Sequence, residues 1–240
     1  MSIAENVALV RENIARAAAA AGRDPKEISL VAASKMNDAD RVRQAIAAGV
    51  DACGENRVQE LVEKNAQGAY EGCPLHFIGH LQRNKVKQVV GVAELIHSVD
   101  SLPLLSAIDA AAKVKGVRQQ VLLEVNIANE ASKSGFKAEE LSAVLENCGQ
   151  SSSIWVRGLM AIPPICTSPK ENRPYFTNME QLFIDIWQKK YDNVSMDFLS
   201  MGMSGDYTEA VACGATMVRV GAAIFGARNY NQQFSMEARP

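Results

Sequence analysis

Leu30-Val31-Ala32-Ala33-Ser34-Lys35 is a short run of small and branched apolar residues that ends on a lysine. A short apolar run bounded by polar residues is typical of a fully buried strand. A lysine at its end has two interpretations, because an ammonium group is costly to bury without a partner. Its stem can be buried while its charge stays in water. Alternatively, Lys35 lies at the mouth of a barrel and forms a Schiff base with a carbonyl compound.

Strand and helix patterns alternate along the rest of the chain. An amphipathic helix is predicted first, over residues 3–21. After the strand that precedes Lys35, the predicted strands are 50–54, 75–79, 95–98, 120–126, 155–160, 198–200 and 217–220, and the predicted helices are 38–48, 55–68, 82–87, 101–115, 137–148, 171–190 and 204–213. This rhythm predicts a single (β/α)8 TIM barrel over residues 1–240, with an extra N-terminal helix. A doubly wound sheet is disfavoured, because no G-x-G-x-x-G follows the first strand.

Composition limits the classes of protein to consider. The 240 residues are 48% apolar and 22% charged, which is enough to bury a sizeable core. The net charge of −2 argues against a broad nucleic-acid or membrane surface, and neither a signal peptide nor a membrane span is expected. The five cysteines (Cys53, Cys73, Cys148, Cys166 and Cys213) form no C-x-x-C pair, so free thiols and a cytoplasmic location are expected. The tail 232–240 is expected to be loosely held.

Two loops near the end of the chain have the chemistry of phosphate sites. Ser200-Met-Gly-Met-Ser-Gly-Asp206 and Val218-Arg-Val-Gly-Ala-Ala-Ile-Phe-Gly226 follow the seventh and eighth predicted strands, where barrels commonly bind phosphate. Glycine lets backbone N–H groups approach an anion, and a helix amino terminus favours negative charge. The alternative is two ordinary turns, with Ser204 a plain helix cap. Together with Lys35, the two loops favour a phosphorylated aldehyde cofactor, bound by free N–H groups of Gly221 and Ala222.

Six motifs together carry a resemblance to a known family. They are Val31-Ala-Ala-Ser-Lys35, Gly54-Glu-Asn-Arg-Val-Gln-Glu60, His76-Phe-Ile-Gly-His-Leu-Gln-Arg-Asn-Lys85, Gly158-Leu-Met160, Leu199-Ser-Met-Gly-Met-Ser-Gly-Asp206 and Val218-Arg-Val-Gly-Ala-Ala-Ile-Phe-Gly226. As a set, over nearly the whole chain, they resemble the pyridoxal phosphate homeostasis protein family. That family shares its barrel with the amino-terminal domain of alanine racemase.

The resemblance implies a set of cofactor-binding residues. Lys35 would hold pyridoxal 5′-phosphate as a Schiff base, and Asn56 would lie beside the ring. The phosphate would be surrounded by Ser200, Ser204, Gly221 and Ala222, and Arg219 would face the pyridine nitrogen. The chain departs from the family pattern at Met36, Asn37, Arg57, Ala215 and Ala222. Ala222 can still offer its backbone N–H, but a side-chain hydroxyl contact to phosphate is lost there.

Arg219 would weaken the cofactor as an electron sink. Guanidinium is a donor only, so it can hydrogen-bond only an unprotonated ring nitrogen. An acidic partner would instead keep that nitrogen charged and favour carbanion chemistry. The resulting hypothesis is a binder that stores, buffers or delivers the cofactor without strong catalytic activity. Its expected partners are pyridoxal phosphate and apo forms of enzymes that use it, and a monomer is expected rather than a dimer.

Two rival functions remain open. One is a pyridoxal phosphate enzyme of the same barrel type, such as an amino acid racemase. Alanine racemases take a second base, a tyrosine, from an additional domain, and no such domain or suitably placed tyrosine is evident in this chain. The other is a barrel enzyme in which Lys35 forms a Schiff base with a sugar phosphate.

Other candidate residues are weaker. Metal binding by His76 and His80 is disfavoured, because no acidic or cysteine ligand is near in sequence. Arg83, Lys85 and Lys87 are expected on a solvated helix face. Cys53 is expected to be a small buried residue.

Overall fold

The described residues of the computed structural model, 1–130, 133–149 and 151–226, form a closed barrel of eight parallel strands. The strands are β1 (Ser29–Ala33), β2 (Ala52–Glu55), β3 (Leu75–Phe77), β4 (Leu95–Val99), β5 (Gln119–Val125), β6 (Ile154–Ala161), β7 (Val194–Met203) and β8 (Met217–Val220). Each strand pairs with the next, and β8 pairs with β1 to close the ring. The predicted (β/α)8 fold is confirmed.

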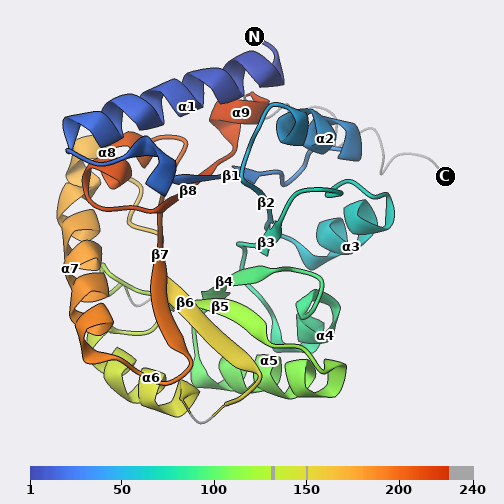
Figure 1. Ribbon diagram of the computed structural model, residues 1–240, viewed down its shortest axis with the longest axis vertical. Coiled ribbons are helices and arrows are strands. Elements are labelled where there is room, and N and C mark those ends of the chain that lie inside the picture. Colours follow the sequence, from blue (N-terminus) through green and yellow to red (C-terminus); the bar gives the residue numbers. More distant parts are fainter. Residues whose placement is uncertain (131–132, 150, 227–240) are drawn as a thin grey trace.

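Helices surround this ring of strands (Figure 1). The α-helices are α1 (Ile3–Ala20), α2 (Ala39–Ala47), α3 (Val58–Ala66), α4 (Val86–Val89), α5 (Leu102–Lys115), α6 (Leu141–Cys148), α7 (Arg173–Lys189), α8 (Tyr207–Ala212) and α9 (Ala222–Phe225). The short 3-10 helices are η1 (Pro25–Glu27), η2 (Arg83–Lys85), η3 (Ala138–Glu140) and η4 (Pro169–Asn172). Within the described ranges, no helix is long and apolar enough to cross a membrane. The tail 232–240 lies outside them.

The predicted N-terminal helix is present as α1. Ser2 and Glu5 form a capping box that satisfies backbone N–H groups at its start. Its apolar stripe packs beside α8, α9 and α2 (Figure 1). The Asn6 side chain also donates a 2.8 Å hydrogen bond to the carbonyl of Ile224 in α9. This helix therefore supports the segment after β8 from the outside.

Several predicted element ends differ from the structure, and three of them bear on the site. β1 ends at Ala33, so Lys35 lies two residues beyond the strand. Glu55 belongs to β2 rather than to the following helix, because it continues the parallel pairing with β3 opposite Phe77. Ser204 is not a helix cap. The Asp206 carboxylate accepts from the N–H of Met203 at 2.7 Å and closes a tight turn, so α8 begins only at Tyr207.

Alternation along the strands arranges the barrel interior in layers, because every second residue of a strand faces the same side. One layer is apolar and lies nearer the amino ends of the strands. It contains Val31, Ala52, Leu95, Leu122, Met160 and Met217, packed with Phe198. Two residues further along their strands come Ala33, Gly54, His97, Glu124, Ser200 and Arg219. The interior thus changes from apolar to small and polar toward the carboxyl ends of the strands.

Candidate functional site

Lys35 stands at the carboxyl end of the barrel, between the ends of β2 and β8. Ala33 pairs with Gly54, and the N–H of Ser34 donates to the carbonyl of Gly54 at 2.9 Å, so Lys35 and Asn56 follow the ends of neighbouring strands. On the other side, Ala32 pairs with Val220, which brings Gly221 next to Ala33. A Cβ on Gly221 would lie 3.2 Å from the carbonyl oxygen of Ala33. Glycine suits this close approach, because a side chain there would crowd Ala33. The predicted site residues Lys35, Asn56 and Gly221 thus follow three neighbouring strand ends.

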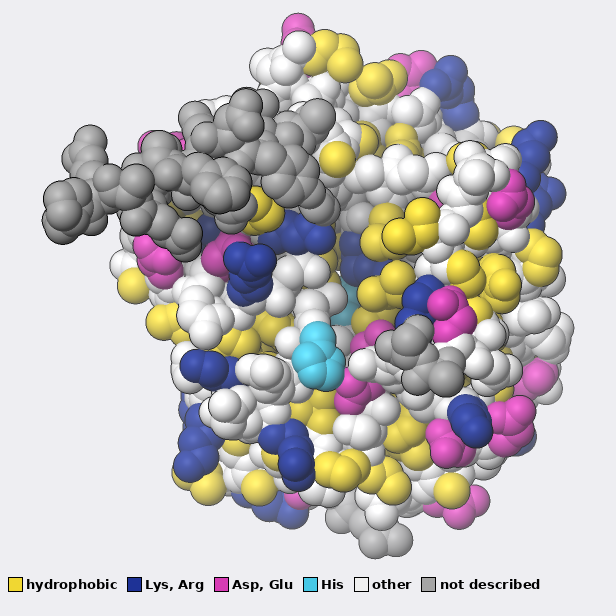
Figure 2. Space-filling view, turned by 180° about the vertical axis from the view of Figure 1, so that it is seen from behind, with side chains coloured by type: hydrophobic (Ala, Val, Ile, Leu, Met, Phe, Trp, Pro, Cys, Tyr) yellow, Lys and Arg dark blue, Asp and Glu magenta, His cyan; other side chains and the backbone are white. Residues whose placement is uncertain are grey.

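The face of the molecule drawn in Figure 2 has a hollow near its centre, where atoms of His and of Lys or Arg side chains are visible. Around the hollow, positive and negative side chains are interspersed.

Asn56 carries an unusual buried atom. Its Oδ1 is buried and has no hydrogen-bond partner among the described residues. The backbone of Asn56 is fixed by Gly79, where an added Cβ would lie 2.1 Å from the Asn56 carbonyl oxygen. Buried polar atoms are normally paired. A buried, unpaired amide oxygen just after β2, the strand next to the one that leads to Lys35, is therefore a candidate ligand contact.

The Ser204 hydroxyl joins the two glycine-rich loops. Its Oγ accepts from the N–H of Gly221 at 3.1 Å and of Ala223 at 3.4 Å. The predicted free N–H of Gly221 is therefore wrong for this structure. The N–H of Ala222 is at the first position of α9, where intrahelical partners are lacking. These groups form one donor cluster at the end of β8, suited to an anion.

Arg219 is buried inside the barrel and held by three hydrogen bonds. Its guanidinium donates to the carbonyl oxygen of Ser200 at 2.8 Å, to Ser200 Oγ at 2.6 Å and to the carbonyl oxygen of Ala161 at 2.9 Å. Burial lowers the pKa of Arg219 to about 10, so it remains protonated at neutral pH. Ser200 thus holds Arg219 through both its carbonyl oxygen and its hydroxyl.

Two neutral histidines extend this network across the barrel. His97 Nδ1 lies 3.1 Å from Ser200 Oγ, and His97 Nε2 lies 3.0 Å from His76 Nδ1. Burial lowers the pKa of His76 to about 4 and that of His97 well below its ordinary value. Since Arg219 can only donate, the Ser200 proton is free to point at His97, which then donates to His76. Arg219 is therefore the charged hydrogen-bond donor of this network, and the two histidines take up no proton at neutral pH.

Glu124 lies in the same interior layer, on β5. Burial, and then the charge of Asp100, raise the pKa of Glu124 to about 7. The positive charge of Arg219 acts in the opposite direction. Sequence reasoning gave this residue no role, since a glutamate inside a predicted strand carries no local signal of its own.

A buried charged cluster behind Lys35 was also missed. Glu55 Oε1 accepts from Ser34 Oγ at 2.6 Å, Lys64 Nζ at 2.7 Å and the Tyr70 hydroxyl at 2.9 Å. Burial, and then the charge of Glu55, raise the pKa of Tyr70, which stays a donor. Lys64 also bonds Glu60 at 3.1 Å. In sequence, Glu60 and Lys64 have the spacing of an exposed helical pair, and nothing local predicts their burial.

The weaker candidates have mixed outcomes. Arg83 and Lys87 are exposed as expected, whereas Lys85 is half-buried. His80 has an acidic neighbour that was not predicted, since its Nδ1 lies 3.4 Å from Asp100. No group of three or more potential metal ligands occurs within the described ranges. Cys53 is buried as expected, and its Sγ lies 3.9 Å from that of Cys73.

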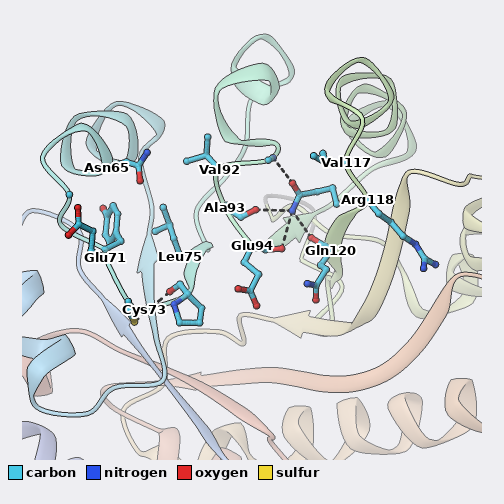
Figure 3. A pocket seen from close by; sticks show the side chains of 16 residues that line it. Asn65, Glu71, Cys73, Leu75, Val92, Ala93, Glu94, Val117, Arg118 and Gln120 are labelled. Atoms are coloured by element: carbon cyan, nitrogen blue, oxygen red, sulfur yellow. Dashed lines mark hydrogen bonds between the residues drawn. The ribbon is translucent and has the colours of Figure 1, made fainter.

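A second depression, of about 780 Å³, lies at the opposite end of the barrel (Figure 3). It is lined by the segments that precede β3, β4 and β5. The Gln119 side chain joins these segments by accepting from Gly91 and donating to Ala93 and Glu94. In (β/α)8 barrels this end serves stability rather than chemistry. The candidate site is therefore the end that carries Lys35.

Comparisons with known proteins agree with this placement in the fold. Residues 6–229 match the family model described as "Alanine racemase, N-terminal domain". The chain is 41% identical, over 95% of its length and 97% of the relative, to the pyridoxal phosphate homeostasis protein of Pseudomonas aeruginosa. It is similar to PipY of Synechococcus elongatus, solved with PLP bound, with 33% identity, a TM-score of 0.81 and coverage of 94% and 100%. An alanine racemase from Clostridium difficile shares the fold, with 15% identity, a TM-score of 0.68 and coverage of 95% of this chain and 61% of that one.

Proposed function

This chain belongs to the pyridoxal phosphate homeostasis protein family, and from that premise we propose that it binds pyridoxal 5′-phosphate through Lys35 and stores, buffers or delivers it. The observation that carries the proposal is the meeting of Lys35, Asn56 and the Ser204–Gly221 donor cluster at one end of the barrel. PipY, a relative at 33% identity, was solved with the same cofactor.

The residues present fit this cofactor. Bound there, it supplies an aldehyde that condenses with an amine to a Schiff base, with loss of water. The unpaired Asn56 Oδ1 offers a buried polar contact beside Lys35. The N–H of Ala222 and the hydroxyl hydrogen of Ser204 offer donors to a phosphate, and Ser204 Oγ is held in place by the N–H of Gly221. The absent side chain of Gly221 lets the end of β8 lie close to Ala33 at the end of β1.

Each residue has a distinct role in the proposal. Lys35 provides the amine for the covalent link. Arg219 is fixed by Ser200 and Ala161 and offers only donors, so it suits an unprotonated ring nitrogen. Ser200 contributes by holding Arg219 rather than by direct contact with phosphate. The neighbouring histidines are neutral, so Arg219 carries the positive charge of this interior network.

We propose that the protein has no strong catalytic activity. Racemisation needs a base on each face of the substrate carbon. The Tyr207 hydroxyl accepts from Asn13 of α1 at 2.9 Å, and Tyr70 donates to Glu55, so both are directed away from the barrel mouth. Tyr230 lies outside the described residues. The name of the Pseudomonas aeruginosa relative, a homeostasis protein rather than a racemase, also supports the proposal of no strong catalytic activity.

The domain organisation, oligomeric state, location and partners are proposed on the same basis. We propose one cofactor-binding domain over residues 1–240, acting as a monomer in the cytoplasm, where the five cysteines remain free thiols. Its partners would be apo enzymes that need the cofactor, with no nucleic acid or membrane involved.

Titration of the apoprotein with pyridoxal phosphate, followed by visible absorbance, tests the proposal. The wild type should develop a band that saturates at one equivalent, and Lys35→Ala should not. Lys113→Ala is the control, because Lys113 is exposed and paired with Asp109 on α5. A band that persists in Lys35→Ala, or one that never forms in the wild type, would contradict the assignment.

A further inference from the structure

The segment on both sides of Lys35 is bound by side chains of α3 and of Glu55 at the end of β2. Before it, the carbonyl oxygen of Ser34 accepts from Lys64 Nζ at 3.0 Å, and the Ser34 hydroxyl donates to Glu55 at 2.6 Å. After it, the N–H of Met36 donates to Glu60 Oε2 at 2.7 Å. Residues outside the barrel therefore hold the segment whose amine acts inside it.

The segment they hold is a strained turn. The N–H of Asn37 donates to the carbonyl of Ser34 at 3.1 Å, and Met36 has a φ of 61°. An i to i+3 bond with positive φ at the third residue is the pattern of a type II turn, which favours glycine there. Methionine adopts this conformation at a cost. External hydrogen bonds are needed to keep the turn, and with it the direction of Lys35.

The charged side chains that hold the turn, Lys64, Glu55 and Glu60, pair with one another. The Lys64 ammonium has three N–H groups, and its three acceptors are Ser34, Glu55 and Glu60. Its side chain is only 7% exposed, and that of Glu55 is fully buried. The three hydrogen bonds engage all the N–H groups of Lys64, which leaves the chemistry to Lys35.

We propose that Glu55, Lys64 and Glu60 are positioning residues that set the geometry of the Lys35 amine for its covalent link, with Tyr70 fixing Glu55 from behind. The inference rests on the proposed function, since it takes Lys35 as the residue that links the cofactor. Misplacing a reacting group by about 1 Å can cost on the order of a hundredfold in reactivity. Removing the cluster should therefore weaken the link while the phosphate and ring contacts persist.

The test compares Glu60→Ala with Glu63→Ala, two changes of the same residue type on α3. Glu60 bonds Met36 and Lys64, whereas Glu63 is exposed. A second variant, Glu55→Gln with Lys64→Met, removes both buried charges together, so that neither is left unpaired. Two probes are titrated: pyridoxal phosphate, and pyridoxine 5′-phosphate, which has the same ring and phosphate but no aldehyde.

The expected result is a split between the two probes. Glu60→Ala should lower the affinity for pyridoxal phosphate and the fraction fixed by borohydride about 10- to 100-fold, with affinity for pyridoxine phosphate unchanged. Glu63→Ala should match the wild type with both probes. Equal losses for both probes would mean that the cluster only supports the fold, and no loss would mean that it has no role. If the wild type itself is not fixed at Lys35, the proposed function fails, and the inference with it.

Discussion

Lys64→Met should be among the most destabilising substitutions of a side chain outside the barrel interior. It removes an ammonium group from three hydrogen bonds, at 3.0 Å to Ser34, 2.7 Å to Glu55 and 3.1 Å to Glu60. It also leaves the carboxylate of Glu55 buried without its counter-charge. The side chains of Lys64 and Glu55 are 7% and 0% exposed, so solvent does not screen the pair.

The size of the effect follows from these contacts. Hydrogen bonds to charged groups contribute about 1.5–3 kcal/mol each, and three of them set an upper limit of about 4.5–9 kcal/mol. The methionine side chain fills most of the space, and breaking a buried pair costs about 3–5 kcal/mol. We therefore expect about 3–5 kcal/mol, which for a chain of this size corresponds to a fall in Tm of about 6–20 °C.

Thermal and urea unfolding of the apoprotein, followed by circular dichroism, measure this loss. Lys113→Met is the matched control, because Lys113 pairs with Asp109 at the same i, i+4 spacing but is 55% exposed. It should cost about 0.5 kcal/mol or less. Adding Glu55→Gln to Lys64→Met should restore part of the stability. A loss below about 1 kcal/mol for Lys64→Met, or no recovery in the double variant, would refute a buried, mutually dependent pair.

Four further outcomes are expected. Burial raises the pKa of Glu124 from 4.5 to about 7, so the native state holds a proton that the unfolded chain releases, and stability falls as the pH rises through that window. Glu124→Gln should thus gain about 2–4 kcal/mol relative to the wild type between pH 4.5 and 7, measured by urea unfolding, and a constant difference would argue against a buried carboxyl. Ser204→Ala should weaken pyridoxal phosphate binding by about 0.5–1.5 kcal/mol through lost hydrogen bonds, and equilibrium titration would show an unchanged Kd if the phosphate lay elsewhere. Gly221→Val should weaken it more, since even a Cβ would lie 3.2 Å from the carbonyl of Ala33, and unchanged affinity in that titration would contradict the assignment of the β8 loop. Alanine in deuterated water should not exchange its α-hydrogen at an enzymatic rate, and rapid exchange with inversion would favour a racemase.

The barrel could be predicted because its signal is repeated along the whole chain. Each buried strand is an apolar run, and each helix has its own stripe and end signal, so an error at one element does not change the count. The ends of elements were less accurate. Glu55 continues β2 because of its pairing with β3, and the turn closed by Asp206 delays α8. Both effects depend on contacts that the local sequence does not reveal.

The candidate site was predictable where a single segment of the sequence carries the chemical signal. Lys35 at a strand end and the glycines near Ser204 and Gly221 carry such signals. The support around them does not. Glu60 and Lys64 have the spacing of a surface pair, and only the packing of α3 against β2 brings them to Glu55.

The histidine network was equally hidden. His76 and His97 come from neighbouring strands, and their rings meet only because β3 and β4 pair inside a closed barrel. No spacing in the sequence distinguishes them from histidines on a surface.

The most direct test of the central claim is peptide mapping after borohydride reduction. The protein, loaded with pyridoxal phosphate, is reduced, digested and analysed by mass spectrometry. The proposal predicts one modified peptide, with the phosphopyridoxyl group on Lys35 and none on Lys64 or Lys113. Modification at another lysine with Lys35 unmodified, or no stable modification at all, would contradict it.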